Sequence, residues 1–307
     1  MADQVAERIV TRRGPIVSSW ERLKRRLKSK SFRSGVATTM ATILAIAGAL
    51  MILFPIAWML STSLKTKFGV FKIPPEWIPM NPQWHNYSEA LTFNPFHIYF
   101  KNTIFYAVSV MIGELLSCSL IAYGFARLRA PGRDKLFLAV LATMMLPAQV
   151  TIIPRYIFFV RVLGWRDSYK PLIVPAFFGS AYLIFLLRQF YMGISKEMDE
   201  AARIDGCGYF STWWRIILPL SKPALGAVAI LSFMWHWNTF MGPLLYLSSN
   251  KKYTLSLGLQ MFRAPFGGTP FHWLMAASLV TVLPCVIVFF FTQRYFIQGI
   301  VITGLKG

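Results

Sequence analysis

Six long apolar stretches alternate with polar segments along the 307-residue chain. A helix needs ~20 consecutive apolar residues to cross a bilayer, and such a stretch with few charges is typical of a transmembrane helix. The stretches cover residues 36–60, 102–126, 136–159, 171–190, 223–247 and 273–296. Pro147 and Pro154 interrupt the third stretch. The pattern predicts an all-α integral membrane protein with six transmembrane helices.

The polar segments between these stretches differ in composition. Residues 1–35 form a strongly basic N-terminal extension. It is either an amphipathic helix on an anionic membrane surface or a disordered tail that holds the N-terminus on one side. Residues 61–101 are rich in proline and tryptophan, which favours a folded external loop at the membrane interface. Residues 191–222 form a further polar loop between the fourth and fifth stretches.

Charge is sparse and unevenly distributed. Hydrophobic residues make up 55% of the chain and charged residues 14%, whereas a soluble protein carries about a quarter charged residues. In the six-span arrangement, 21 of the 32 Lys and Arg lie on the side of the N-terminus. Because basic loops stay in the cytoplasm, this asymmetry predicts that both termini and residues 191–222 are cytoplasmic. The sequence shows no basic stripe combined with a nucleic-acid-binding fold, so nucleic acid is not an expected partner.

The polar loop from Glu200 to Pro223 and the residues just before it have the pattern of two short helices joined by a bend. A serine can cap the first helix, with acids near its positive end. Two glycines then end it, because glycine adopts left-handed conformations that other residues avoid. A second apolar turn over residues 213–218 is expected to stop at a proline. These markers are Ser195, Asp199, Glu200, Gly206, Gly208 and Pro219.

This loop resembles the cytoplasmic EAA loop in the membrane subunits of bacterial ABC importers. The family pattern is matched by Glu200-Ala201-Ala202, Asp205-Gly206 and Ile216-Ile217-Leu218-Pro219. Cys207 stands where the family usually has alanine, which is a small change in side chain. The resemblance implies that the loop couples the chain to ATP-hydrolysing subunits. The residues implied in this coupling are Glu200, Ala201, Ala202, Asp205, Gly206, Ile216, Leu218 and Pro219.

Further motifs extend the resemblance over residues 36–307 and are most similar to the shorter permease partner of maltose-type importers. They are Asn86-Tyr87, Asn102, Ala122-Tyr123, Arg127, Pro131-Gly132, Leu146-Pro147, Trp237-Asn238, Pro243-Leu244, Gln298-Gly299 and Gly304-Leu305-Lys306-Gly307. The resemblance implies half of a translocation pathway for a sugar or sugar derivative, working by alternating access in the bacterial cytoplasmic membrane.

The same resemblance implies several partners. They are a homologous second permease in a heterodimer, two ATP-binding subunits, an extracytoplasmic solute-binding protein and the surrounding lipids. ATP and magnesium are expected in the ATP-binding subunits, so no cofactor and no metal is expected in this chain. It is expected not to be an enzyme, because the sequence has no Gly-x-x-x-x-Gly-Lys-Ser/Thr loop to hold ATP phosphates.

Several side chains in the predicted spans suit a sugar. Aromatic rings can cover the apolar faces of a sugar, and amides can bind its hydroxyls. The residues expected on the solute pathway are Glu114, Gln149, Trp237 and Asn238. Helix packing stays open as the alternative for the last two. Trp235 and His236 lie beside them and are expected to serve in packing.

Glu114 lies near the middle of the second predicted span. An acid at this depth costs ~2.5–3.5 kcal/mol on insertion scales, so it should face the bundle interior or a water-filled cavity. Two roles remain open. The carboxyl group either lines the pathway or pairs across the subunit interface, or it forms an interhelical hydrogen bond in its protonated form.

Two other classes of protein fit the composition. An ion-coupled carrier would show inverted repeats and broken helices within its own chain. A membrane-embedded lipid or sugar-lipid transferase would need paired acids, a histidine or a nucleophile at one membrane interface, and no such cluster is evident. Cys118, Cys207 and Cys285 are expected to be free, and no Cys/His spacing predicts a zinc site.

Overall fold

The structure, a computed structural model, describes residues 30–263 and 268–304. Every regular element in these two ranges is a helix, which confirms the all-α prediction. The chain divides into two compact units, residues 1–59 and 60–307. The predictions for the N-terminal extension before residue 30 and for residues 305–307 of the tail lie outside the described residues.

The first unit contains most of helix α3 (Lys30–Ser63). Its segment Ala37–Ser63 has a mean hydropathy of 2.5 and is long and apolar enough to cross a membrane. Pro55 lies inside the helix without ending it. The first predicted span is therefore confirmed, with bounds of Ala37–Ser63 instead of residues 36–60.

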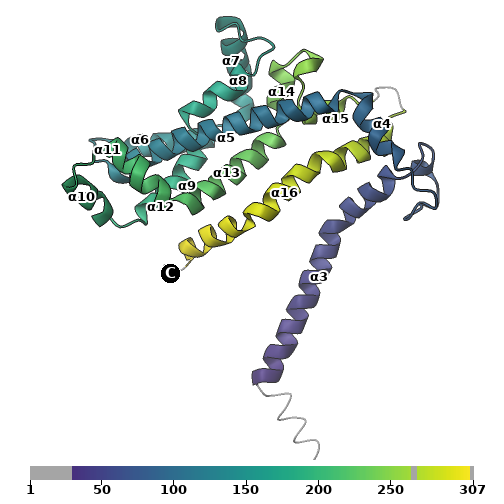
Figure 1. Cartoon of the computed structure of the whole chain (residues 1–307), viewed down its shortest axis with the longest axis horizontal. Coiled ribbons are helices and arrows are strands. Elements are labelled where there is room, and N and C mark those ends of the chain that lie inside the picture. The colour runs from purple at the N-terminus through teal and green to yellow at the C-terminus, as the bar shows by residue number, and fades with distance from the viewer. Residues whose placement is uncertain (1–29, 264–267, 305–307) are drawn as a thin grey trace, which may run out of the picture. The chain divides into compact units, whose positions relative to one another are not determined.

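The second unit is a bundle of helices built around α5, which packs against α9 and α13, while α13 packs against α16 (Figure 1). Two of its elements, η3 and η5, are π-helices. In chain order the elements are η1 (Gly69–Phe71), α4 (His85–Phe93), α5 (Phe96–Arg127), α6 (Arg133–Ala142), η2 (Thr143–Met145), α7 (Ala148–Ile157), η3 (Phe158–Val162), α8 (Lys170–Ile173), η4 (Val174–Phe178), α9 (Ala181–Met192), α10 (Glu197–Ile204), α11 (Tyr209–Thr212), η5 (Trp213–Ile217), α12 (Leu218–Leu220), α13 (Lys222–Trp237), α14 (Met241–Tyr246), η6 (Asn250–Lys252), α15 (Leu255–Gln260) and α16 (Phe271–Gly304).

Two buried apolar clusters hold the two ends of α5. The cluster near its C-terminus includes Tyr123, Leu187 and Trp213, and the cluster near its N-terminus includes Tyr99. Between membrane helices such packing stabilises the contact through van der Waals interactions rather than by removing apolar surface from water. Gly258 packs closely against Tyr99 of the second cluster. A Cβ atom at position 258 would lie 2.4 Å from Cδ2 of Tyr99, so a larger residue would not fit there. Both ends of the helix are therefore fixed by packing.

Within the described ranges, four helices are long and apolar enough to cross a membrane, and the number rises to six if two bent pairs each count as one span. The third predicted span is one of these pairs, bent by 95° between Arg133–Met145 and Ala148–Val162. Leu146 is extended at the bend, because the ring of Pro147 disfavours a helical residue before it. The interruption at Pro147 is confirmed.

The predicted interruption at Pro154 is wrong. Helix α7 runs through Pro154 and is continued by the π-helix to Val162, beyond the predicted end at residue 159. Membrane helices tolerate an internal proline where neighbouring turns adjust to satisfy the freed backbone groups.

The fifth span is shorter than predicted, because α13 ends at Trp237 rather than at residue 247. The amide Nδ2 of Asn238 donates to the carbonyl of Met234, and the hydroxyl of Thr239 donates to the carbonyl of Trp235. These side chains satisfy carbonyls that the next helical turn would otherwise bond. The preceding helix Tyr209–Leu220 meets α13 at an angle of 82°.

Other bounds shift by a few residues. The second span begins at Phe96 instead of residue 102, and the sixth begins at Phe271 instead of residue 273. The fourth covers Lys170–Met192 and contains a break that was not predicted, at Gly179 with φ of +92°. The predicted loop at residues 61–101 contains η1 and α4.

A polar cluster outside the spans joins two loops. The carboxylate of Asp167 accepts hydrogen bonds from the hydroxyl and the N–H of Ser249, from the N–H of Ser248 and from the ammonium group of Lys252. Because the hydroxyl of Ser249 and the two N–H groups stabilise the charged form, the pKa of Asp167 lies well below its usual value. The cluster fixes the loop before α8 to the loop before α15.

Candidate functional site

The EAA loop, residues 191–222, is a helical hairpin at the end of the bundle where α5 terminates (Figure 1). Its first helix is α10, and its second runs from Tyr209 to Leu220 through α11, η5 and α12. The hydroxyl of Ser195 accepts a hydrogen bond from the N–H of Glu197, but the N-cap position is Lys196, one residue later than predicted, and its side chain makes no capping bond. Three acids lie in the first turn of α10, where the helix dipole favours negative charge.

The bend between the two helices is a Schellman motif around Gly206, whose φ is +79°. The N–H of Cys207 donates to the carbonyl of Ala202 over 2.8 Å, and the N–H of Gly206 donates to that of Arg203 over 3.0 Å. The prediction for Gly206 is confirmed. Gly208 does not adopt the predicted left-handed conformation. Its φ is −73°, a value that other residues can also adopt.

The sequence predicted that the second helix stops at Pro219, and this prediction is wrong. The helix includes Pro219 in a last turn and ends at Leu220. Proline near the start of a turn needs no N–H partner, so the turn can form around it. Trp213 and Ile217 anchor this helix, since their side chains are 3% and 0% exposed.

A buried ion pair fixes the EAA loop to the transmembrane bundle. Nη1 of Arg127, the last residue of α5, lies 3.1 Å from Oδ2 of Asp199 on α10, and the two side chains are 4% and 11% exposed. Nη2 of Arg127 also donates to the carbonyl of Ile194 over 2.6 Å. One guanidinium thus holds both the start of the EAA loop and its first helix.

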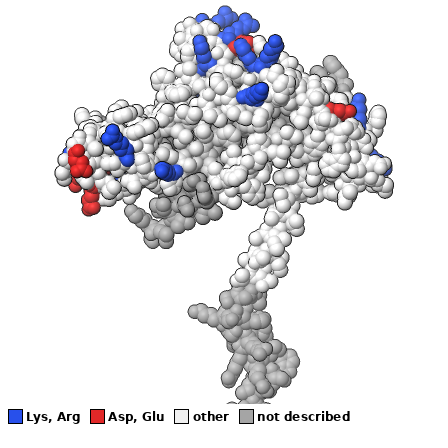
Figure 2. Space-filling view, in the orientation of Figure 1, with Lys and Arg blue, Asp and Glu red and all other residues white. Residues whose placement is uncertain are grey.

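The residues implied in coupling fall into an outer and an inner group. Four of them, Glu200, Ala201, Asp205 and Gly206, are exposed on α10 and the bend, and Pro219 is also exposed. Ala202 is buried, and Ile216 and Leu218 are half-buried. Figure 2 shows acidic and basic side chains gathered at the end of the bundle that carries α10.

Sequence reasoning missed the residues that support this loop. Arg127 was noted only as part of a motif, Asp199 only as a helix-end acid, and Ile217 only as one letter of a pattern. A basic residue that ends the second span and an acid in the loop after the fourth span are a weak pairing signal, because many such charges remain apart.

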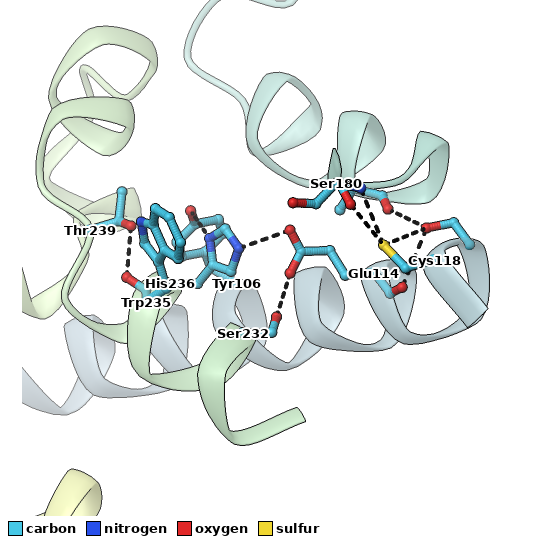
Figure 3. Close-up of polar contacts among 10 residues, drawn as sticks. Tyr106, Glu114, Cys118, Ser180, Ser232, Trp235, His236 and Thr239 are labelled. Atoms are coloured by element: carbon cyan, nitrogen blue, oxygen red, sulfur yellow. Dashed lines mark hydrogen bonds and ion pairs between the residues drawn. The ribbon is translucent and has the colours of Figure 1, made fainter. Parts of the chain in front are cut away.

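Glu114 joins α5 to α13 inside the bundle (Figure 3). Its Oε2 accepts a hydrogen bond from the hydroxyl of Ser232 over 2.6 Å, and its Oε1 lies 3.3 Å from Nε2 of His236. Nδ1 of His236 lies 3.1 Å from the hydroxyl of Tyr106, which returns the network to α5. The Glu114 side chain is 12% exposed. It faces the bundle, as predicted, and has partners within its own chain.

The other residues expected on the solute pathway differ in how far their side chains are exposed. Trp237 is 2% exposed and donates its indole N–H to the carbonyl of Thr281, so it offers no open ring face here. Asn238 and Gln149 are exposed, at the end of α13 and the start of α7. Trp235, expected in packing, is 69% exposed. The structure brings Glu114 and His236 into contact. Packing was expected for His236, and an interhelical contact was one of the two roles left open for Glu114.

The three cysteines are free. Cys118 and Cys285 are buried, and Cys207 is partly exposed at the bend of the EAA loop. Within the described ranges, no group of three His, Cys, Asp or Glu side chains is placed to hold a metal ion.

Residues 116–302 match the family described as binding-protein-dependent transport system inner membrane component, which is more than half of the chain. The chain belongs to this family. A relative in Bacillus subtilis (strain 168), the arabinooligosaccharides transport system permease protein AraQ, is 35% identical over 263 residues, covering 84% of this chain and 92% of that protein.

Two further similarities agree with this assignment. The sn-glycerol-3-phosphate transport system permease protein UgpE of Yersinia pestis bv. Antiqua (strain Antiqua) is 34% identical over 267 residues, covering 84% of this chain and 94% of that protein. A crystal structure of a bacterial ABC transporter involved in the import of the acidic polysaccharide alginate contains a chain that superposes with a TM-score of 0.76. It is 25% identical, and the superposition covers 87% of this chain and 98% of that chain.

Family membership makes this chain a membrane-embedded transport permease of an ABC importer and not an enzyme. It removes the carrier and the transferase as alternatives. Importers of this kind work with a partner permease, an ATPase and a binding protein. The EAA motif found in the sequence is typical of the family.

The buried ion pair makes a first testable prediction. Asp199→Asn should lower the free energy of opening α10 by about 3–5 kcal/mol, because it leaves the Arg127 charge buried without a counter-ion. Amide hydrogen exchange of residues 197–204 in the purified complex measures this change. Asp134→Asn is the matched control, since Asp134 pairs with Arg133 but its side chain is 75% exposed. Equal exchange in the two variants would show that the pair does not hold α10.

The Glu114 network makes a second prediction. Glu114→Leu should destabilise the bundle by about 1–3 kcal/mol for each partner left unsatisfied, whereas Glu114→Gln keeps an acceptor for Ser232 and should cost less. Thermal unfolding in detergent separates the two variants. If Glu114→Gln unfolds normally but abolishes uptake, the carboxylate acts on the pathway rather than in packing.

Proposed function

We propose that the chain forms half of the translocation pathway for a sugar or sugar derivative and that its EAA loop contacts a cytoplasmic ATPase. The observation that carries this proposal is that the bend of the EAA loop is exposed while its first helix is fixed to the bundle. Ile204 and Phe210, on either side of the bend, are 86% and 65% exposed. The first helix is fixed by the buried pair of Arg127 and Asp199. Large apolar side chains exposed together are typical of a contact with another subunit.

The residues of the EAA loop divide between contact and transmission. Glu200, Ala201, Asp205 and Gly206 face outward, which suits the surface that meets the ATPase. Ala202 is small and buried, so it lets α10 lie close to the bundle. The second helix carries Ile216, Leu218 and Pro219 and leads directly into α13. A displacement of α10 would therefore be transmitted to both α5 and α13.

The solute class is supported by the relatives, which include permeases for arabinooligosaccharides and sn-glycerol-3-phosphate and a chain from an alginate importer. The partners we propose are a homologous second permease, two ATP-binding subunits that hold ATP and magnesium, and an extracytoplasmic solute-binding protein. The excess of basic residues on the side of the EAA loop supports cytoplasmic termini.

The mechanism that follows is alternating access. Closure of the two ATPase subunits on ATP moves α10, and the Arg127–Asp199 pair passes this movement to α5. α5 packs against α9 and α13, so the spans rotate together. By thermodynamic linkage, the loaded binding protein outside must favour the same state that ATP favours inside.

Gly206 tests the coupling role. Gly206→Val should cost about 1–3 kcal/mol, because a β-branched residue resists the left-handed conformation at this position. Apart from its two chain neighbours, no described residue has an atom within 4 Å of the added Cβ, so the cost arises from the backbone alone. We expect normal membrane insertion and permease pairing, with ATP hydrolysis no longer driving uptake in proteoliposomes.

Gly208→Thr is the matched control. Threonine has the size of valine and is accepted at a helix N-cap, and Gly208 already has a negative φ. It should transport normally. Full uptake by Gly206→Val at normal expression would contradict the proposed role of the EAA loop.

A further inference from the structure

A polar cavity of about 280 Å³ lies between the EAA loop and the turn that joins α5 to α6. Its lining is dominated by charged side chains from three elements. They are Arg127 at the end of α5, Arg129 and Arg133 around the turn, and Lys196, Asp199, Glu200 and Arg203 around and on α10; Ala126 and Tyr209 complete the lining.

The cavity has more positive than negative groups. Five basic side chains line it against two carboxylates, and one of these carboxylates is already paired with Arg127. Within the described residues, Arg129 and Lys196 form no ion pair, and Arg203 lies only over the ring of Tyr209 at 5.0 Å. A cavity with this excess of cations attracts an anion.

A buried donor marks the same place. The guanidinium of Arg127 is buried, and among the described residues neither its Nε donor nor the Oδ1 acceptor of its partner Asp199 has a hydrogen-bond partner. A buried N–H without a partner is costly, and native structures rarely leave one unsatisfied. A ligand with acceptor oxygens in the cavity would satisfy the donors that surround it.

The position of the cavity selects the kind of anion. Only residues 128–132 separate α5 from α6, so the turn lies where two membrane spans end. Lipid phosphates lie at this level of a bilayer, and basic pockets at helix ends bind anionic headgroups. Arginine matches the geometry of phosphate through paired N–H donors.

We propose that this cavity binds a phosphate group, held by Arg129, Lys196 and Arg203 around the Arg127–Asp199 pair. The group is either the phosphodiester of an anionic lipid or free phosphate. Its contacts join the turn before α6 to α10, so an occupied site holds the EAA loop more firmly against the bundle. Any effect of this ligand on transport rests on the proposed coupling role, whereas the binding itself does not.

The competing occupant is an acidic side chain of the docked ATPase. The cavity is lined by the turn between α5 and α6 as well as by α10, and although Glu200 reaches it, the exposed apolar residues Ile204 and Phe210 at the bend do not line it. This separation favours a membrane component over the ATPase.

Lipid retention provides the test. The full complex, purified in neutral detergent with phosphatidylglycerol added, is analysed by native mass spectrometry. Arg129→Gln combined with Lys196→Gln should retain phosphatidylglycerol about tenfold less than the wild type, because charge-assisted hydrogen bonds are lost. Lys222→Gln, an exposed lysine of the same loop that does not line the cavity, should match the wild type.

A second arm separates the two phosphate sources. Inorganic phosphate is added to the complex in phosphatidylcholine nanodiscs, and amide exchange of α10 is followed. Slower exchange in the wild type but not in the double variant, with no selective lipid retention, assigns the site to free phosphate. Slower exchange only with phosphatidylglycerol assigns it to lipid.

The proposal is overturned if neither phosphatidylglycerol nor inorganic phosphate distinguishes the double variant from Lys222→Gln. If the double variant instead loses its ATPase subunits in neutral lipid, the cavity receives ATPase carboxylates, and the proposal is equally wrong. Neither measurement depends on uptake, so failure of the coupling role would leave the result readable.

Discussion

The buried ion pair between Arg127 and Asp199 is the contact on which the position of the EAA loop depends. It joins the last residue of α5 to α10, in which Ala202 is the other buried residue. A buried pair of charges adds little net stability compared with apolar packing, but breaking it is costly. Such a contact therefore serves to fix one arrangement, which is what a mechanical connection between α10 and the spans requires.

The same principle accounts for the polar groups inside the bundle. Glu114 is surrounded by Ser232 and His236, and Asn238 and Thr239 satisfy carbonyls at the end of α13. In a membrane, unsatisfied polar groups are expensive, so these contacts hold α13 in a defined relation to α5. Movement that reaches α5 from the EAA loop must therefore involve α13 as well.

The sequence allowed the helical class, the spans and the left-handed Gly206 to be predicted, because each depends on local composition or on a single backbone requirement. The end of α13 was misjudged, since Asn238 and Thr239 interrupt an apolar run with capping bonds that hydropathy does not register. The bonding partners of Glu114 and the pairing of Arg127 with Asp199 are contacts between distant parts of the chain. Because these residues are far apart in the sequence, only the folded structure shows which of them pair.

The number of ATP molecules hydrolysed for each solute imported tests the central claim most directly. It is measured in proteoliposomes containing the full importer with Asp199→Asn, and with Arg127→Met combined with Asp199→Leu. We expect the single variant to hydrolyse ATP with little uptake. The apolar pair should recover much of the coupling, because packed apolar side chains can replace a buried ion pair. A wild-type ratio in Asp199→Asn, with α10 loosened, would contradict the account.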